Sequence, residues 1–295
     1  MDIKQLRFLA ALAVEKHFGR AAAACYVTQP TLSLRIRQLE EELGVPLILR
    51  GNRFEGLTQE GERVVAWARR VLANYEGLYQ DVAAMKGQLS GQLRLGVVPS
   101  ALPFAANLTT PFLAQYPDVS VVSKSMSADE IAHGLEEFTL DAGIAYLSTD
   151  MPDNFHSLTL YHETYVALVP DQENFPNGPA IAWSKAAELP LCLLTEGMYN
   201  RRIIENTFAS VGCVVRSQFQ SNSILTLYAH VRSGHWATIV PANHAQLVGH
   251  LQGVRSLDLV EPEVSHPVGL VWRDADPLSP VVAALCAIAG SQIID

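Results

Sequence analysis

Residues 21–43 contain two short helical patterns that meet at a tight turn, and this stretch constrains the fold more than any other. In the second pattern, apolar residues recur at steps of four and three, as on one face of an α-helix: Leu32, Ile36, Leu39 and Leu43. The Thr28 hydroxyl is placed to cap the first turn, and Pro30 lies in that turn, where its missing N–H costs little. We therefore predict a helix that begins near Gln29.

A pattern rich in alanine, at residues 20–25, precedes the turn and lets a second helix approach closely. Only Tyr26 and Val27 remain for the connection, so the pair has helix-turn-helix geometry. The second helix carries polar residues at its start and along one side: Gln29, Thr31, Ser33 and Arg35. Side chains of these types can reach base edges and phosphates in a major groove. An ordinary amphipathic helix pair with a solvated face would have the same spacing.

The residues that follow favour the DNA-binding alternative. Residues 45–50 are typical of a short strand, residues 51–56 of a tight turn, and residues 57–58 of a return into another helix. This pattern predicts a two-stranded wing that carries arginine, and Arg50 and Arg53 are its candidates for contact with phosphates or the minor groove.

Spaced motifs in this region resemble the N-terminal signature of LysR-type transcriptional regulators. They are Gln-Pro at 29–30, Ser33, Ile-Arg-Gln-Leu-Glu at 36–40, Leu-Gly-Val-Pro-Leu at 43–47 and Leu-Thr-Gln-Glu-Gly at 57–61. Leu34 departs from the arginine that the family often has there, and Ile48 from a phenylalanine. The resemblance implies binding to double-stranded operator DNA through a winged helix-turn-helix. The contact residues would be Gln29, Pro30, Thr31, Ser33, Arg35, Arg50 and Arg53.

The resemblance extends over nearly the whole chain and implies an α/β fold with an α-rich head. We expect a DNA-binding domain at 1–58, a linker helix at 59–87 and a two-lobed effector domain at 88–295, similar to the periplasmic binding proteins of type 2. Lobe I would comprise residues 92–161 and 267–295, and lobe II residues 162–266. Strand and helix patterns alternate in both halves, which predicts parallel sheets covered by helices.

A heptad-like apolar seam runs along the predicted linker helix, at Val64, Ala68, Val71, Tyr75, Leu78 and Val82. Such a seam favours a coiled-coil dimer. A helix with one face packed on its own domain is the alternative. The family implies a homodimer or homotetramer, with RNA polymerase as a further candidate partner.

The effector site is expected where strands end. Ser100 follows a strand and opens a helix, where a hydroxyl and free amides can bind an anion or a polar ligand, although a plain helix cap explains Ser100 as well. Matching positions in the family line the effector cleft. The expected residues are Ser100, Ala101, Leu102, Ser127, Tyr146, Thr195, Asn200, Arg201 and Asn222. A small anionic metabolite is the expected effector.

Composition agrees with this interpretation. The chain has a net charge of −9, but residues 1–90 hold 12 Lys and Arg against 10 Asp and Glu, so the acidic excess lies in the remainder. The chain opens without a leader pattern, and no apolar run approaches the roughly 18 residues of a membrane span, so we expect a cytoplasmic protein that does not contact membranes.

The sequence gives little support for enzyme activity, metal binding or redox sensing. Common nucleotide-binding, hydrolase and metalloprotease motifs are absent, so we expect no enzyme, catalytic residue, metal or cofactor. Cys25, Cys192, Cys213 and Cys286 are isolated, which favours reduced thiols. A redox sensor built on Cys192 and Cys213 remains an alternative, as does a cytosolic solute-binding protein.

Overall fold

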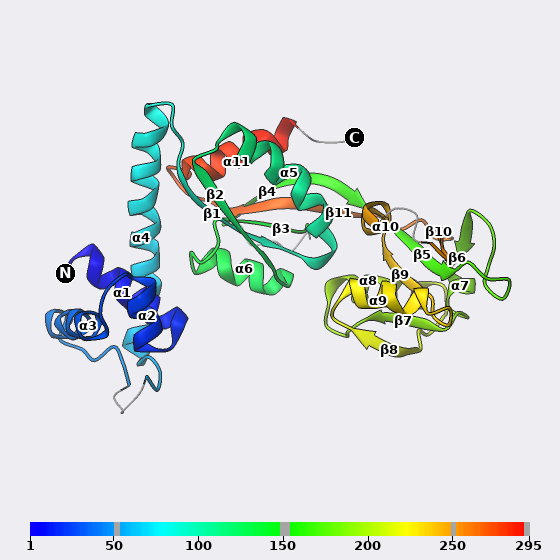
Figure 1. Cartoon of the computed structure of the whole chain (residues 1–295), viewed down its shortest axis with the longest axis horizontal. Helices are drawn as coiled ribbons and strands as arrows, with labels where there is room; N and C mark the ends of the chain where they lie inside the picture. Colours follow the sequence, from blue (N-terminus) through cyan, green and yellow to red (C-terminus); the bar gives the residue numbers. More distant parts are fainter. Residues whose placement is uncertain (50–53, 148–153, 249–251, 292–295) are drawn as a thin grey trace.

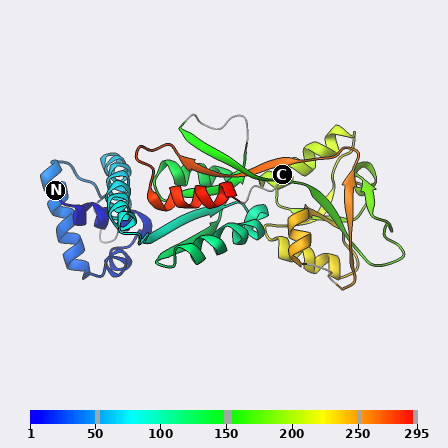
Figure 2. The same cartoon turned by 90° about the horizontal axis from the view of Figure 1, so that it is seen from above.

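A helical head, one long helix and two α/β lobes follow one another along the computed structural model, which describes residues 1–49, 54–147, 154–248 and 252–291 (Figures 1 and 2). The head contains α1 (Ile3–Glu15), α2 (Phe18–Ala24) and α3 (Gln29–Leu43), and α4 (Gln59–Met85) leads away from it. Among the described helices, none combines the length and apolar character needed to cross a membrane.

The head has a core of its own, built from the stripes that the sequence predicts. Leu9 of α1 and Leu32 and Leu39 of α3 are fully buried (0% exposed) in one cluster. Burial of such a face is what stabilises a short amphipathic helix. Gly44 ends α3 in the left-handed conformation (φ 70°), which glycine adopts without strain.

Two of the spaced motifs hold the wing against the head. The Glu40 carboxylate accepts hydrogen bonds from the backbone amides of Leu47 (2.8 Å) and Ile48 (3.2 Å). The Thr58 hydroxyl accepts a hydrogen bond from the Gly61 amide (2.9 Å) and caps α4. Gly61 has to be glycine, because a Cβ atom there would lie 2.0 Å from the Leu47 carbonyl oxygen.

The described part of the wing contains less strand than the sequence predicts. Over residues 45–49 and 54–57 it pairs through one antiparallel bridge, between Ile48 and Leu57. A backbone hydrogen bond from the Leu49 amide to the Gly56 carbonyl oxygen (3.0 Å) supports that bridge. Arg50 and Arg53 lie outside the described residues.

Lobe I is a five-stranded sheet with the order β2-β1-β3-β11-β4. Its elements are β1 (Gly91–Val97), η1 (Pro99–Ala101), α5 (Leu102–Gln115), β2 (Val119–Ser125), α6 (Ala128–Glu136), β3 (Ala142–Tyr146), β4 (Phe155–Glu163), β11 (His266–Arg273) and α11 (Pro280–Ser291). Strands β1, β2 and β3 are parallel as predicted, whereas β11 is antiparallel to both β3 and β4. The prediction of parallel sheets was therefore wrong here: the chain leaves lobe I along β4 and returns along β11, so these two strands run in opposite directions.

Lobe II contains a four-stranded sheet of order β6-β10-β5-β9 and a parallel pair, β7-β8. Its elements are β5 (Tyr165–Pro170), β6 (Ala180–Ala182), α7 (Trp183–Ala186), β7 (Leu191–Leu194), α8 (Tyr199–Ser210), β8 (Ser217–Ser221), α9 (Ile224–Arg232), β9 (Thr238–Pro241), α10 (Ala242–Val248) and β10 (Val254–Val260). Strand β5 is antiparallel to both β9 and β10, so this sheet is mixed as well. The chain crosses between the lobes at Thr164, between β4 and β5, and again between β10 and β11.

Candidate functional site

The start of α3 is an exposed surface on a helix whose other face is buried in the head. Gln29, Pro30 and Thr31 are exposed and Ser33 is half-buried. Thr28 occupies the cap position, but its hydroxyl does not cap an amide; it makes a hydrogen bond with the Thr31 hydroxyl (2.8 Å). The predicted side-chain cap was therefore wrong, and the first-turn amides of α3 receive no side-chain partner from Thr28.

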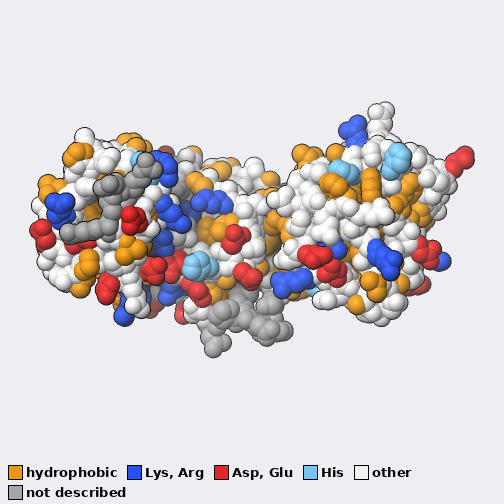
Figure 3. All heavy atoms as spheres, turned by 90° about the horizontal axis from the view of Figure 1, so that it is seen from below, with side chains coloured by type: hydrophobic (Ala, Val, Ile, Leu, Met, Phe, Trp, Pro, Cys, Tyr) orange, Lys and Arg blue, Asp and Glu red, His pale blue; other side chains and the backbone are white. Residues whose placement is uncertain are grey.

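Arg35 lies on the same helix but is not free. Its Nη1 atom lies 3.5 Å from an Asp2 carboxylate oxygen, and both side chains are about half exposed (44% and 48%). An ion pair this exposed contributes little stability, so Arg35 can exchange Asp2 for a phosphate at small cost. Basic and acidic side chains lie close together on the face of the head that Figure 3 shows, which agrees with the near-balance of charge in residues 1–90.

Two exposed residues beside this surface were missed by the sequence analysis. Tyr26 is 96% exposed and has a positive φ of 55° in the turn between α2 and α3. Leu34 is 55% exposed. The sequence signal that could have identified Tyr26 as an exposed residue is its position: it is a bulky side chain in a turn too short for ordinary φ angles throughout.

Between the lobes, the strand-end residues form a buried hydrogen-bond network. The Tyr146 hydroxyl bonds with Ser100 Oγ (2.8 Å) and donates a hydrogen bond to Glu163 Oε1. The Tyr165 hydroxyl donates to the same carboxylate oxygen (2.8 Å), and the Tyr161 hydroxyl lies 3.4 Å from Oε2. Ser100 and Glu163 are each only 2% exposed. The Ser100 hydroxyl, predicted to face a ligand, is therefore engaged by Tyr146.

Burial governs the protonation of this network. It raises the pKa of the Glu163 carboxyl, while hydrogen bonds from Tyr146, Tyr165, Ser100 and Tyr161 act in the opposite direction. It also raises the pKa of Tyr146, Tyr161 and Tyr165 above the usual phenol range, and the Glu163 charge adds to the effect. These hydroxyls therefore remain protonated and act as donors at neutral pH.

Lobe II closes on this network through α8 and α10. The Tyr199 ring stacks on the Tyr146 ring, with centroids 4.5 Å apart. The Asn243 amide nitrogen donates to the Ser100 carbonyl oxygen and to the Tyr161 hydroxyl (3.2 Å each). His244 Nε2 lies 3.0 Å from the Pro99 carbonyl oxygen. The interlobe space around Ser100 is thus filled by side chains of the protein itself.

The start of α8 contrasts with that filled region. Asn200 is only 4% exposed, yet neither atom of its amide group has a hydrogen-bond partner among the described residues. No side chain caps this helix. A buried polar group without a partner costs free energy, which a ligand could recover.

Arg201 is placed differently from our expectation. It is 3% exposed, its Nη1 donates to the Leu194 carbonyl oxygen (2.9 Å), and its Nε pairs with Glu205 (2.7 Å). The guanidinium thus joins α8 to the end of β7 inside lobe II and is not offered to a ligand. Arg202 is the exposed arginine of this helix, and its guanidinium lies 5.1 Å from the Tyr199 ring centroid.

The remaining predicted effector residues are scattered. Ala101 is fully buried, Leu102 is 40% exposed and Asn222 is exposed. Ser127 caps α6 in a reciprocal arrangement with Glu130, so its hydroxyl already has a structural role. Thr195 is half-buried, and its backbone amide donates to the Ser221 carbonyl oxygen (3.0 Å). Within the described residues, no cluster of His, Cys, Asp and Glu is arranged to hold a metal ion.

Known protein families match both parts of this architecture. The profile described as "Bacterial regulatory helix-turn-helix protein, lysR family" matches residues 3–62, and the profile "LysR substrate binding domain" matches residues 86–293. The chain belongs to the LysR family. It is a LysR-type transcriptional regulator with a helix-turn-helix DNA-binding domain and an effector-binding domain.

Several LysR regulators are similar over more than nine-tenths of their length. The "DNA-binding transcriptional dual regulator OxyR" of Escherichia coli K12 is 31% identical over 280 residues, which cover 94% of this chain and 91% of that protein. A "Hydrogen peroxide-inducible genes activator" of Haemophilus influenzae is 31% identical over 288 residues, covering 94% and 92%. The solved structure of a full-length OxyR variant from Pseudomonas aeruginosa superposes with a TM-score of 0.78 at 26% identity, covering 100% and 99%.

Burial makes three cysteines of this LysR regulator, Cys25, Cys192 and Cys286, harder to ionise. Cys192 is fully buried, and burial raises its pKa to about 11. Burial likewise raises the pKa of Cys286 to about 11, and that of Cys25. All four cysteines are free. Because the thiolate is the reactive form, this geometry disfavours the redox-sensing alternative at Cys192.

The predicted seam of the linker helix has two parts: its first residues pack in the head, and its later residues are exposed. Ala68 is only 1% exposed because it packs in the core of the head, so it is not available to a partner helix. Val64 is half-buried against the same core. Farther along, Val71, Leu78 and Val82 are 38%, 60% and 45% exposed. The accessible apolar stripe is therefore the second half of α4.

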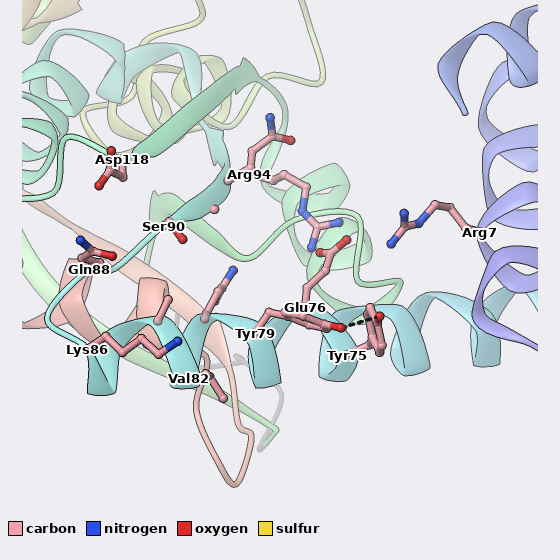
Figure 4. Close-up of a pocket in the computed structure, with 14 residues that line it drawn as sticks. Arg7, Tyr75, Glu76, Tyr79, Val82, Lys86, Gln88, Ser90, Arg94 and Asp118 are labelled. Atoms are coloured by element: carbon pink, nitrogen blue, oxygen red, sulfur yellow. Dashed lines mark hydrogen bonds between the residues drawn. The ribbon is translucent and has the colours of Figure 1, made fainter. Parts of the chain in front are cut away.

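A groove of about 840 Å³ lies between α4 and the start of β1, and Val82 is the residue of that stripe that lines it (Figure 4). The Tyr75 and Tyr79 hydroxyls are hydrogen bonded along it (3.0 Å), and Arg7 of α1 approaches from the head (Figure 4). Its charged lining is mixed, with Lys86 and Arg94 beside Glu76 and Asp118. A groove lined by charges of both signs is better suited to contact with a protein than to binding one small ion.

Proposed function

We propose that residues 1–58 of this regulator read operator DNA, with Gln29, Thr31 and Ser33 at the bases and Arg35 at bases or phosphates. The observation that carries this proposal is the exposed start of α3 on a helix whose opposite face is fixed in the head core. Tyr26 is a further contact residue, because it stands almost fully exposed beside that surface. Arg50 and Arg53 belong to the same proposal through their place in the wing sequence.

An operator-binding experiment tests these contacts. With DNA from the promoter beside its own gene, Gln29→Ala should lose about 1–3 kcal/mol of binding free energy, as expected for a side chain that reads bases. Gln115→Ala is the matched control, because Gln115 is an exposed glutamine at the end of α5, outside the head. If Gln29→Ala, Thr31→Ala and Gln115→Ala all bind the operator as tightly as the wild type at equal salt concentration, the assignment is incorrect.

We further propose that residues 59–87 form the dimerisation helix and that a second copy of the chain covers its exposed stripe. Support comes from Val71, Leu78 and Val82, whose apolar side chains follow one another along the same helix in contact with water. A dimer places two recognition helices on one operator, which is the geometry that helix-turn-helix dimers use on DNA. A tetramer would arise from two such dimers, and we expect the regulator to act in the cytoplasm.

For residues 88–295 we propose that the effector binds at the start of α8, beside Asn200 and the Tyr146–Tyr199 stack. The supporting observation is the buried Asn200 amide, which has no partner among the described residues. The uncapped helix N-terminus and the exposed Arg202 favour a small anionic metabolite. A thermal-shift screen of small carboxylates should find a ligand that stabilises the wild type but not Asn200→Leu. A ligand that stabilises both proteins equally would place the site elsewhere.

A further inference from the structure

A cavity of about 560 Å³ lies between α5 of lobe I and α10 of lobe II. Its floor is the β4–β5 crossover, with Tyr161, Glu163 and Thr164. None of the described residues that line this cavity belongs to the start of α8, so it is separate from the proposed effector site.

One buried negative group dominates the floor of this cavity. Among the described residues of the lining, Glu163 is the only Asp or Glu, and there is no Lys or Arg. Within the same part of the chain, no lysine, arginine or histidine forms an ion pair with it. A carboxylate buried without a counter-charge is costly, which favours its protonated form, and an ammonium ion bound beside it would stabilise the ionised form instead.

The two carboxylate oxygens of Glu163 are satisfied unequally. Oε1 receives hydrogen bonds from the Tyr146 and Tyr165 hydroxyls, whereas the Tyr161 hydroxyl lies 3.4 Å from Oε2, and Ser100 also acts on the carboxylate. A carboxylate oxygen accepts about two hydrogen bonds, so Oε2 retains acceptor capacity. Asn243, which also lines the cavity, adds an amide oxygen that is buried without a described partner.

The wall of the cavity is aromatic. Phe104 stacks on Tyr161, with ring centroids 4.6 Å apart and planes 30° apart. Aromatic faces attract cations as well as apolar groups, because the ring carries partial negative charge on its faces. The cavity therefore offers hydrogen-bond acceptors on Glu163 and Asn243, a carboxyl group without a basic partner among the described residues, and an apolar wall.

We propose that this interlobe cavity binds a small primary amine with an apolar body. The ammonium group of the amine donates hydrogen bonds to Glu163 Oε2, and the apolar body packs against Phe104 and Tyr161. Because α5 and α10 belong to different lobes, such a ligand contacts both of them. This site is additional to the anion site at α8 and does not depend on it.

Phenethylamine and isopentylamine are suitable probes, with 2-phenylethanol and isopentanol as neutral controls of similar shape. Binding to the full chain is measured by calorimetry and thermal shift at neutral pH. We expect at least one amine to bind, with an affinity at least about tenfold higher than that of its alcohol. In Glu163→Gln, which keeps the shape of the side chain, amine binding should weaken about tenfold or more and the preference over the alcohol should disappear.

Further variants separate the cavity from the fold and from the α8 site. Asn107 is exposed on α5 and lines the cavity, so Asn107→Trp should block it without disturbing the buried network. Asn200→Leu should leave amine binding unchanged, because Asn200 lies outside the cavity. The proposal is overturned if neither amine binds the wild type, if Glu163→Gln binds them equally well, or if Asn107→Trp has no effect.

Discussion

Tyr146 of lobe I and Tyr199 of lobe II stack across the interlobe space, with ring centroids 4.5 Å apart and ring planes 25° apart. Each ring stands at the edge of its own lobe, Tyr146 at the end of β3 and Tyr199 at the start of α8. The stack therefore links the relative position of the lobes to the helix that carries Asn200.

Replacing Tyr199 tests this link. Tyr199→Leu should lower the free energy of unfolding of the effector domain by about 0.5–1.5 kcal/mol beyond the lost apolar area, as measured for aromatic pairs. Tyr199→Phe keeps the ring and is the matched control. Urea unfolding followed by near-ultraviolet circular dichroism measures the difference, and equal stability of the two variants would contradict a stabilising stack.

The pH dependence of stability should report the buried Glu163 carboxyl. Because burial raises its folded pKa above the unfolded value of about 4.3, the folded state binds this proton more tightly. Its contribution to stability is complete below about pH 4.3 and is lost as the pH rises through the folded pKa.

Glu163→Gln is neutral at every pH, so its unfolding free energy relative to the wild type should rise over the pH range that extends from about 4.3 upward through the folded pKa of Glu163. Glu173→Gln removes a carboxyl group at an exposed position and is the control. A difference between wild type and Glu163→Gln that stays constant across this range would show that the folded pKa is not raised.

Two glycines of α4 provide a matched pair. Gly61→Ala would place a Cβ atom 2.0 Å from the Leu47 carbonyl oxygen, whereas a Cβ at Gly77 meets no described atom within 4 Å. We expect Gly61→Ala to destabilise the head by about 1–3 kcal/mol and to weaken operator binding. Gly77→Ala should stabilise the helix by up to about 1 kcal/mol. Thermal unfolding and gel shifts measure both effects, and similar behaviour of the two variants would refute the close approach at Leu47.

A charge on the exposed part of α4 should break the proposed dimer. Leu78 is 60% exposed, and Leu78→Asp would bury two carboxylates without partners in a helix pair, at a cost of several kcal/mol. Ala84→Asp adds the same charge at an exposed position on the opposite side of the helix, outside the stripe. Sedimentation should show monomers only for Leu78→Asp, and a Leu78→Asp protein that still sediments as a dimer would exclude this interface.

Peroxide should not switch this regulator through Cys192. With a pKa of about 11, roughly one thiol in ten thousand is ionised at neutral pH, and the side chain is fully buried. Operator binding should therefore respond to hydrogen peroxide in Cys192→Ala as it does in the wild type. A Cys192–Cys213 disulfide found by mass spectrometry after treatment would reverse this conclusion.

The head shows which structural features can be predicted from short-range sequence patterns. The stripe from Leu32 to Leu39, Gly44 after α3 and the spaced motif that ends in Gly61 are short-range features, and each has a local physical cause in the structure. Helix periodicity and capping act over a few residues, so they are legible in a single sequence. The family, the recognition helix and the linker helix could be identified from such patterns alone. Much of the order of strands and helices in the lobes was predictable for the same reason, but β6, α7, α10 and β10 were not predicted, and neither was strand direction.

Side chains far apart in the chain meet only through the packing of the folded lobes and head. Ser100 pairs with Tyr146 across 46 positions, Arg201 turns to the carbonyl of Leu194, and Ala68 belongs to the head core instead of the seam. These partners depend on sheet register and on how the lobes close, which no local spacing encodes. The buried Glu163 network and the cavity beside it exist for the same reason, because they form where the two lobes pack together.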